Sequence, residues 1–175
     1  MIRSAEPADV PALLALVREL AAYEREPDAV EATEPLLHTA LFDPDAGASC
    51  LVAEADGRVV GLALWFRTFS TWLGRYGIHL EDLYVQPAHR GAGHGRALLA
   101  RLAQIAVERG WGRVEWQVLD WNVDAQGFYS GLGARSLDDW TTFRLDGAAL
   151  TELATDATRS ALLGNPRSPD CRYTG

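Results

Sequence analysis

Two spacings of apolar residues alternate along the chain and predict both helices and strands. Between Asp9 and Glu24 apolar residues recur every three or four positions, which predicts an amphipathic helix with Asp9 as its N-cap. Strict alternation of apolar and polar residues predicts strands instead. The same reasoning predicts further helices over about 31–41, 94–109 and 122–130, and strands over 2–5, 49–54, 58–69, 78–85, 113–121 and 140–146.

The order of these elements indicates a single α/β or α+β domain. Asp56-Gly57 joins two of the early strands, and this dipeptide is typical of a tight hairpin between antiparallel strands. Further along, strand, helix and strand follow one another, which implies a parallel pair joined by a right-handed crossover. We assign the domain to residues 1–154 and interpret the polar, proline- and glycine-containing residues 155–175 as a C-terminal appendage.

The composition excludes several classes of protein. The chain has 175 residues, of which 48% are hydrophobic, so it has enough apolar residues for a core and is not disordered. No apolar run approaches the ~18 residues of a membrane-spanning helix, and the N-terminus lacks the apolar segment of a signal peptide. Two cysteines, Cys50 and Cys171, are too few for a disulfide framework, which favours a cytoplasmic protein.

The charge and the histidines narrow the possible partners. A net charge of −8 argues against a nucleic-acid partner, which would favour a basic face. The charge is compatible with a cationic ligand, although solubility alone is a common reason for a mildly acidic chain. No metal site is predicted, because metal-ligand spacing is absent among His38, His79, His89 and His94.

The strand over 78–85 contains two adjacent acids at which the alternation changes its phase. Ile78 and Leu80 occupy even positions, whereas Leu83 and Val85 occupy odd ones. A β-bulge at Glu81-Asp82 would keep all four on one face, and it would leave backbone groups without a strand partner and open to a ligand. The alternative is a solvated strand end with two acids on its exposed side.

The segment that follows, RGAGHGRALL, has glycines at 91, 93 and 95 before a helix. Glycines allow close approach of the backbone, and a helix N-terminus offers unpaired amides to a phosphate or pyrophosphate. Arg90 and Arg96 add positive charge at its edge, although the segment could also be a simple glycine-rich turn. Arg96 stands where a dinucleotide-binding motif would have its last glycine, so that motif and the P-loop both fit poorly.

The chain resembles the GNAT superfamily of N-acetyltransferases over residues 2 to about 154. The resemblance rests on RELAAYE, FSTWLGR, LEDLYVQPAHRGAGHG, VLDWN, FYSGLGA and DWTTF, and it is closest to diamine (spermidine/spermine) and thialysine N-acetyltransferases. It implies a mixed seven-stranded sheet in which two parallel strands splay at the bulge, with acetyl-CoA between them and a homodimeric assembly. The implied acetyl-CoA contacts are Leu83, Tyr84, Val85, Arg90, Gly91, Ala92, Gly93, His94, Gly95, Arg96, Asn122, Asp124 and Ala125.

Acetyl transfer to an amine needs a base for the ammonium and an acid for the departing thiolate. Glu81 at the bulge is the candidate base, directly or through water. The family's tyrosine of the FY pair maps onto Tyr129, which is therefore the candidate acid, although a tyrosine on an amphipathic helix is usually a packing residue. The resemblance implies acceptor contacts from Tyr23, Glu24, Trp72, Glu81, Asp82, Trp116 and Asp138.

Several of these acceptor residues have an ordinary structural interpretation as well. Glu24 could be a solvated helix end, Trp72 and Trp116 could be packing residues, and Asp138 fits a solvated turn. The predicted function is acetyl transfer from acetyl-CoA to a small cationic amine, namely a polyamine, a diamine or a lysine-like amino acid. Acetylation of a peptide amine and a non-catalytic acyl-CoA sensor are the alternatives, and no membrane partner is expected.

Overall fold

A computed structural model describes residues 1–163, and Cys171 with most of the predicted appendage lies outside the described residues. The chain divides into two compact units, Met1–Val123 and the residues from Asp124 onward, which are described separately. None of the helices in residues 1–163 has the length and apolarity needed to span a membrane.

The first unit is built on one mixed sheet with the strand order β1-β2-β3-β4-β5. Its neighbouring strands are antiparallel except for β4 and β5, which are parallel. The mixed sheet was predicted, but the described residues contain five strands where seven were expected. The strands are β1 (Ile2–Ser4), β2 (Ala48–Ala55), β3 (Arg58–Ser70), β4 (Arg75–Val85) and β5 (Val114–Glu115).

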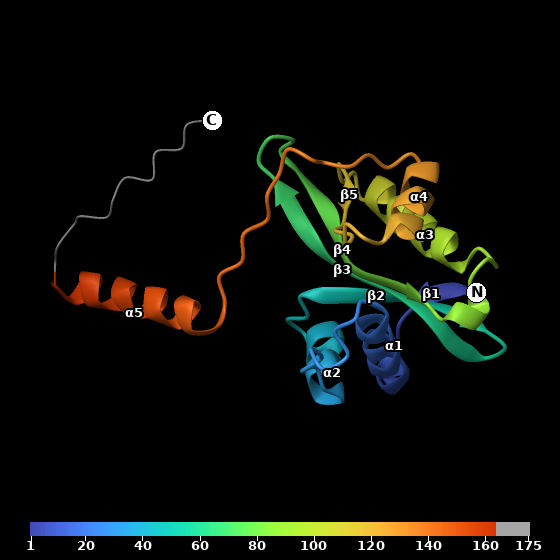
Figure 1. Cartoon of the computed structure of the whole chain (residues 1–175), viewed down its shortest axis with the longest axis horizontal. Coiled ribbons are helices and arrows are strands. Elements are labelled where there is room, and N and C mark those ends of the chain that lie inside the picture. Colours follow the sequence, from blue (N-terminus) through green and yellow to red (C-terminus); the bar gives the residue numbers. More distant parts are fainter. Residues whose placement is uncertain (164–175) are drawn as a thin grey trace. The chain divides into compact units, whose positions relative to one another are not determined.

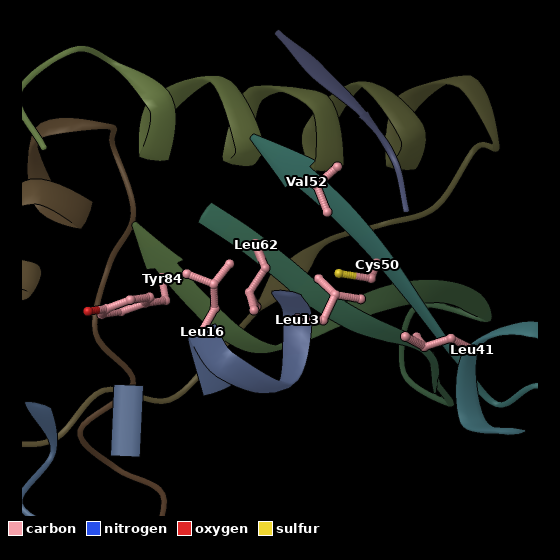
Figure 2. Packing of buried hydrophobic residues seen from close by; sticks show 7 residues of the cluster. All are labelled: Leu13, Leu16, Leu41, Cys50, Val52, Leu62 and Tyr84. Atoms are coloured by element: carbon pink, nitrogen blue, oxygen red, sulfur yellow. The ribbon is translucent and has the colours of Figure 1, made fainter. Parts of the chain in front are cut away.

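Helices cover both faces of this sheet. In Figure 1, α1 and α2 lie on one face and α3 lies on the other. One hydrophobic cluster joins α1 and α2 to strands β2, β3 and β4, and Figure 2 shows how Leu13 and Leu16 point from α1 toward it. The helical segments of this unit are η1 (Pro7–Asp9), α1 (Val10–Tyr23), α2 (Glu34–Phe42), η2 (Pro87–His89) and α3 (His94–Glu108).

Asp9 precedes α1, as the sequence predicts, but its carboxylate does not cap that helix. It accepts hydrogen bonds from the Glu6 backbone amide and from both terminal nitrogens of Arg3, at 2.6 and 2.9 Å. The Arg3 guanidinium holds the pKa of this carboxyl below its usual range. Asp9 therefore joins β1 to the start of α1 and fixes where that helix packs on the sheet.

Two predicted strands are wrong in extent or in kind. The strand predicted over 113–121 is confined to Val114–Glu115, because β5 pairs with β4 only opposite Ile78 and His79. The stretch 140–146, also predicted as a strand, has no strand. Alternation alone does not make a strand, because a ladder of hydrogen bonds with a neighbouring strand is also required.

The second unit contains two helices, α4 (Val123–Gly131), which starts at the last residue of the first unit, and α5 (Gly147–Leu163). The helix predicted from Asn122 corresponds to α4, whereas α5 was missed. Its alanine- and leucine-rich sequence has high helix propensity, which was the available signal. The boundary predicted between residues 154 and 155 falls inside α5.

Candidate active site

The site is built around an irregularity in β4 that the sequence predicts. Leu80 pairs with Trp65 and Asp82 pairs with Leu64, so Glu81 is the extra residue of a β-bulge. Residues directly opposite one another share a face, and Ile78, Leu80, Leu83 and Val85 all pair with odd-numbered residues of β3. The bulge therefore keeps these four residues on one face, and the interpretation of Glu81-Asp82 as a bulge is confirmed.

The parallel partner of β4 ends just before this bulge. The β4–β5 ladder contains only Ile78 with Val114 and His79 with Glu115. Beyond it, the Gln86 amide bonds to the Val60 carbonyl of β3, and alternation turns the amides of Leu83 and Val85 away from β3. These two amides consequently face the side of β4 where β5 no longer pairs, as a splayed strand pair requires.

The glycine segment forms a turn that ends in the N-terminus of α3. Gly91 and Gly93 have φ values of 79° and 84°, and Gly93 is the N-cap of the helix. A Cβ atom at either glycine would meet nothing within 4 Å, so the loop has open space in front of it. The amides that follow Gly93 are the ones that no intrahelical carbonyl reaches. This arrangement suits the anion site that the sequence predicts.

The two arginines of this segment behave differently. Arg96 is exposed on the first turn of α3. The Arg90 side chain instead donates from Nε to the Val85 carbonyl at 2.9 Å. Its guanidinium carbon lies 5.0 Å from the Tyr23 ring centre and 5.5 Å from that of Tyr84. The Arg90 side chain therefore connects the glycine segment over 90–96 to the end of β4 and to the last turn of α1.

Asp82 and Glu24 form an acidic pair on the α1 side of the sheet. Burial, together with the negative charges of Glu81 and Glu24, raises the pKa of Asp82 to about 6. Burial also raises the pKa of Glu24. Within residues 1–163, Asp82 makes no ion pair and accepts no hydrogen bond from a cationic side chain. An acid with this environment is stabilised by an incoming cation.

Glu81 projects from the bulge with more than half of its side chain exposed. Its Oε2 lies 3.6 Å from His79 Nε2. No catalytic or binding role for His79 was predicted from the sequence. Its position two residues before the bulge, which places it beside the first acid, was the available signal.

The end of α1 is in contact with the segment before α4. The Tyr23 hydroxyl donates to Asn122 Oδ1 at 3.2 Å, and its ring lies 5.9 Å from that of Trp121. Arg25, which has a positive φ of 69°, places its guanidinium 4.5 Å from the Trp121 ring centre. Trp121 and Arg25 were missed as members of this cluster, although Trp121 belongs to the quoted VLDWN motif.

The remaining predicted residues lie elsewhere or in the other unit. Trp72 is 88% exposed at the tip of the β3–β4 hairpin, and the strand from Arg75 to Glu81 spans about 20 Å at ~3.3 Å per residue. Trp116 follows directly after β5 and is half-buried. Asp124, Ala125 and Tyr129 lie on α4 in the second unit. Asp138, also in that unit, accepts a hydrogen bond from Ser136 at 3.3 Å. The first unit therefore brings Tyr23, Glu24 and Asp82 close to the glycine segment over 90–96. Trp72 lies far from them, at the tip of the hairpin.

Comparisons with known proteins identify the family of this chain. The Acetyltransferase (GNAT) family profile matches residues 13–134. A thialysine N-epsilon-acetyltransferase of Bos taurus is 41% identical over 165 residues, which cover 88% of this chain and 96% of the relative. An L-ornithine N5-acetyltransferase of Arabidopsis thaliana is 30% identical over 194 residues, covering 85% of each protein. An integron cassette protein of V. cholerae superposes with a TM-score of 0.74 at 26% identity, covering 88% of this chain and 96% of that one. The bulged strand and the glycine turn thus occur in a chain that belongs to the GNAT family of acetyltransferases.

Proposed function

We propose that this acetyltransferase moves an acetyl group from acetyl-CoA to the primary amine of a small cationic acceptor. The acceptor class is a lysine-like amino acid, a diamine or a polyamine. The observation that carries the proposal is the acidic pair of Asp82 and Glu24 beside the bulge, because a partly buried carboxylate without a cationic partner favours a cationic ligand. The relatives named for thialysine and for ornithine support the same class.

In this proposal Asp82 and Glu24 bind the positively charged ammonium group of the acceptor. Charge-assisted hydrogen bonds from an ammonium group would offset the cost of keeping Asp82 ionised in a partly buried position. The exposed ring of Tyr23 adds an aromatic face next to Glu24. A second ammonium on the acceptor would find the exposed carboxylate of Glu81, so a dication fits this set of acids better than a monocation does.

The donor is proposed to lie along the open side of β4. The Leu83 and Val85 amides would pair with the amide-bearing arm of acetyl-CoA and orient the thioester carbonyl, which acquires negative charge during the reaction. The amides of the Gly91–Arg96 segment would hold the pyrophosphate at the start of α3. Open space at Gly91 and Gly93 is the structural observation that suits a bulky anion there.

Two protons have to be moved. An alkyl ammonium has a pKa near ~10.4, so the acceptor arrives protonated and must lose a proton before it attacks the thioester. We assign this step to Glu81, directly or through water. The departing thiolate then gains a proton, and we assign that step to the Tyr129 hydroxyl on the basis of the FY motif.

The test is thiol release from acetyl-CoA with a panel of amines. The panel contains spermidine, a short diamine, ornithine, thialysine, a monoamine of matched length and a lysine-containing peptide. We expect turnover with the dications and amino acids, and kcat/KM at least tenfold lower for the monoamine because it engages fewer carboxylates. A preference for the peptide would favour protein acetylation. Tight acetyl-CoA binding without turnover of any amine would favour the non-catalytic sensor.

A matched pair of variants tests the acceptor site itself. Asp82→Asn should raise the KM for the amine strongly and leave the affinity for acetyl-CoA unchanged. Asp43→Asn is the control, since Asp43 is an acid of the first unit that pairs with His38 after α2. Equal effects of the two substitutions on the amine KM would show that overall charge, and not the acidic pair, attracts the acceptor.

A further inference from the structure

His79 is a histidine of β4 whose ring is fixed by its surroundings. It pairs with Phe66 across the β3–β4 ladder, and the two rings stack with centroids 4.8 Å apart and planes 28° apart. About a quarter of the His79 side chain is exposed, compared with 55% of that of Glu81. The imidazole is therefore a fixed group beside a more exposed carboxylate.

Glu81 is the acid to which His79 is directed. The separation of His79 Nε2 and Glu81 Oε2 is 3.6 Å. The other acid next to His79 is Glu115, which pairs with it on β5. The Glu115 carboxylate forms an ion pair with Arg113, whose Nε lies 2.7 Å away. Asp82, also on β4, interacts electrostatically with Glu81 and with Glu24 of the α1 end. With Glu115 engaged by Arg113, the imidazole has Glu81 as its acidic partner among the described residues.

A carboxylate that acts as a base must point at the proton it removes. Glu81 protrudes from a bulge, and holding a long side chain in one rotamer costs up to about 2 kcal/mol of conformational entropy. A neighbour that restricts the rotamer before the acceptor arrives reduces this cost at the moment of reaction. The stacked imidazole of His79 is such a neighbour.

We propose that His79 is a positioning residue, which holds the Glu81 carboxylate in the orientation needed for deprotonating the acceptor ammonium. The inference rests on the proposed function, because it assigns Glu81 the role of base. His79 acts through Glu81 and touches neither the acceptor nor the donor. Its loss should therefore lower kcat and leave acetyl-CoA binding unchanged.

A double-mutant cycle tests this coupling with wild type, His79→Ala, Glu81→Gln and the double variant. We expect His79→Ala to lower kcat about 10- to 100-fold, which is the effect of a small misplacement of a catalytic group. In the Glu81→Gln background, measured at high enzyme concentration, the same substitution should change the residual rate less than twofold, because the group that it positions is gone. His79→Gln, which keeps a nitrogen donor, should recover part of the lost rate.

The chain offers a matched control in His38. Its ring packs 5.5 Å from Phe42 and its Nδ1 lies 3.5 Å from Asp43, so it repeats the arrangement of aromatic ring, imidazole and acid on another element. His38→Ala should leave kcat unchanged, and thermal melts of all variants would show that each is folded. An unchanged kcat in His79→Ala, or an equal loss in both backgrounds, would overturn the inference while wild-type activity upholds the proposed function. An inactive wild type would overturn the proposed function and this inference with it.

Discussion

The Tyr23 hydroxyl donates a hydrogen bond of 3.2 Å to Asn122 Oδ1, across 99 residues of sequence. The bond joins the last residue of α1 to the segment that precedes α4. The sequence predicts Tyr23 as an acceptor contact and Asn122 as an acetyl-CoA contact. Because the two side chains are bonded to each other, we expect the predicted acceptor contact and the predicted acetyl-CoA contact to depend on one another.

Replacing Tyr23 with phenylalanine tests this link. Tyr23→Phe keeps the ring that packs on Trp121 and Arg90, and it removes only the hydrogen bond. A hydrogen bond of this kind contributes about 0.5–1 kcal/mol, so we expect the amine KM and the acetyl-CoA dissociation constant to rise together, each about two- to fivefold. Steady-state kinetics and calorimetric titration measure the two constants.

Tyr76→Phe is the control for that experiment, since Tyr76 lies near the β3–β4 hairpin and packs against Phe69. It should change neither constant. A rise in the amine KM alone in Tyr23→Phe would mean that Asn122 binds without help from Tyr23.

The bulge was predictable from sequence because it changes the phase of a local pattern. The change of phase between Ile78 and Leu80 on one side and Leu83 and Val85 on the other lies within eight residues, and it places the bulge at Glu81-Asp82. The strand register shows that Glu81 is the extra residue. The positive φ values at Gly91 and Gly93 follow in the same way from local residue type. Local sequence determines these features because each depends on neighbours a few residues away.

Contacts between distant segments could not be predicted in that way. The expectation that Arg90 serves the phosphate loop did not include its bond to Val85 and its stacking on Tyr23. The stretch 140–146 alternates like a strand, but pairing requires a partner edge that local alternation does not reveal. These outcomes depend on tertiary contacts, which carry no periodic signal.

Gly93 and Gly110 provide a comparison of two glycines with the same backbone conformation and different roles. Their φ values are 84° and 65°, they flank the two ends of α3, and a Cβ on either meets nothing within 4 Å. Alanine at each should cost roughly 1–2 kcal/mol of stability through the left-handed conformation. Only Gly93→Ala should also weaken acetyl-CoA binding, by at least tenfold, because its Cβ intrudes on the proposed anion site.

Thermal melts and acetyl-CoA titrations of both variants measure the two effects separately. Equal weakening of acetyl-CoA binding in Gly93→Ala and Gly110→Ala would attribute the loss to destabilisation of α3. The assignment of a pyrophosphate site to its N-terminus would then be withdrawn.

Tyr129→Phe tests the proton donor. General acid catalysis contributes about 100- to 10,000-fold, so we expect kcat to fall within that range. The affinity for acetyl-CoA should change less than twofold, because only one hydroxyl is removed. Phe128, the preceding residue, provides the control Phe128→Leu, which alters the same motif without removing a proton donor. An undiminished kcat in Tyr129→Phe would place the proton source elsewhere.

The pKa of Asp82 makes stability depend on pH in a defined direction. In the folded chain burial, with Glu81 and Glu24, raises this pKa from 3.8 to about 6. Because its pKa is raised, the Asp82 carboxyl makes its full contribution to the free energy of unfolding below about pH 4. This contribution is lost as the pH rises through about 6. Asp82→Asn cannot ionise and escapes this loss, so its stability relative to wild type should grow between pH 4 and 7, by up to about 3 kcal/mol. Urea unfolding at both pH values measures the difference. A difference that does not change with pH would mean that Asp82 ionises as freely in the folded chain as in the unfolded one.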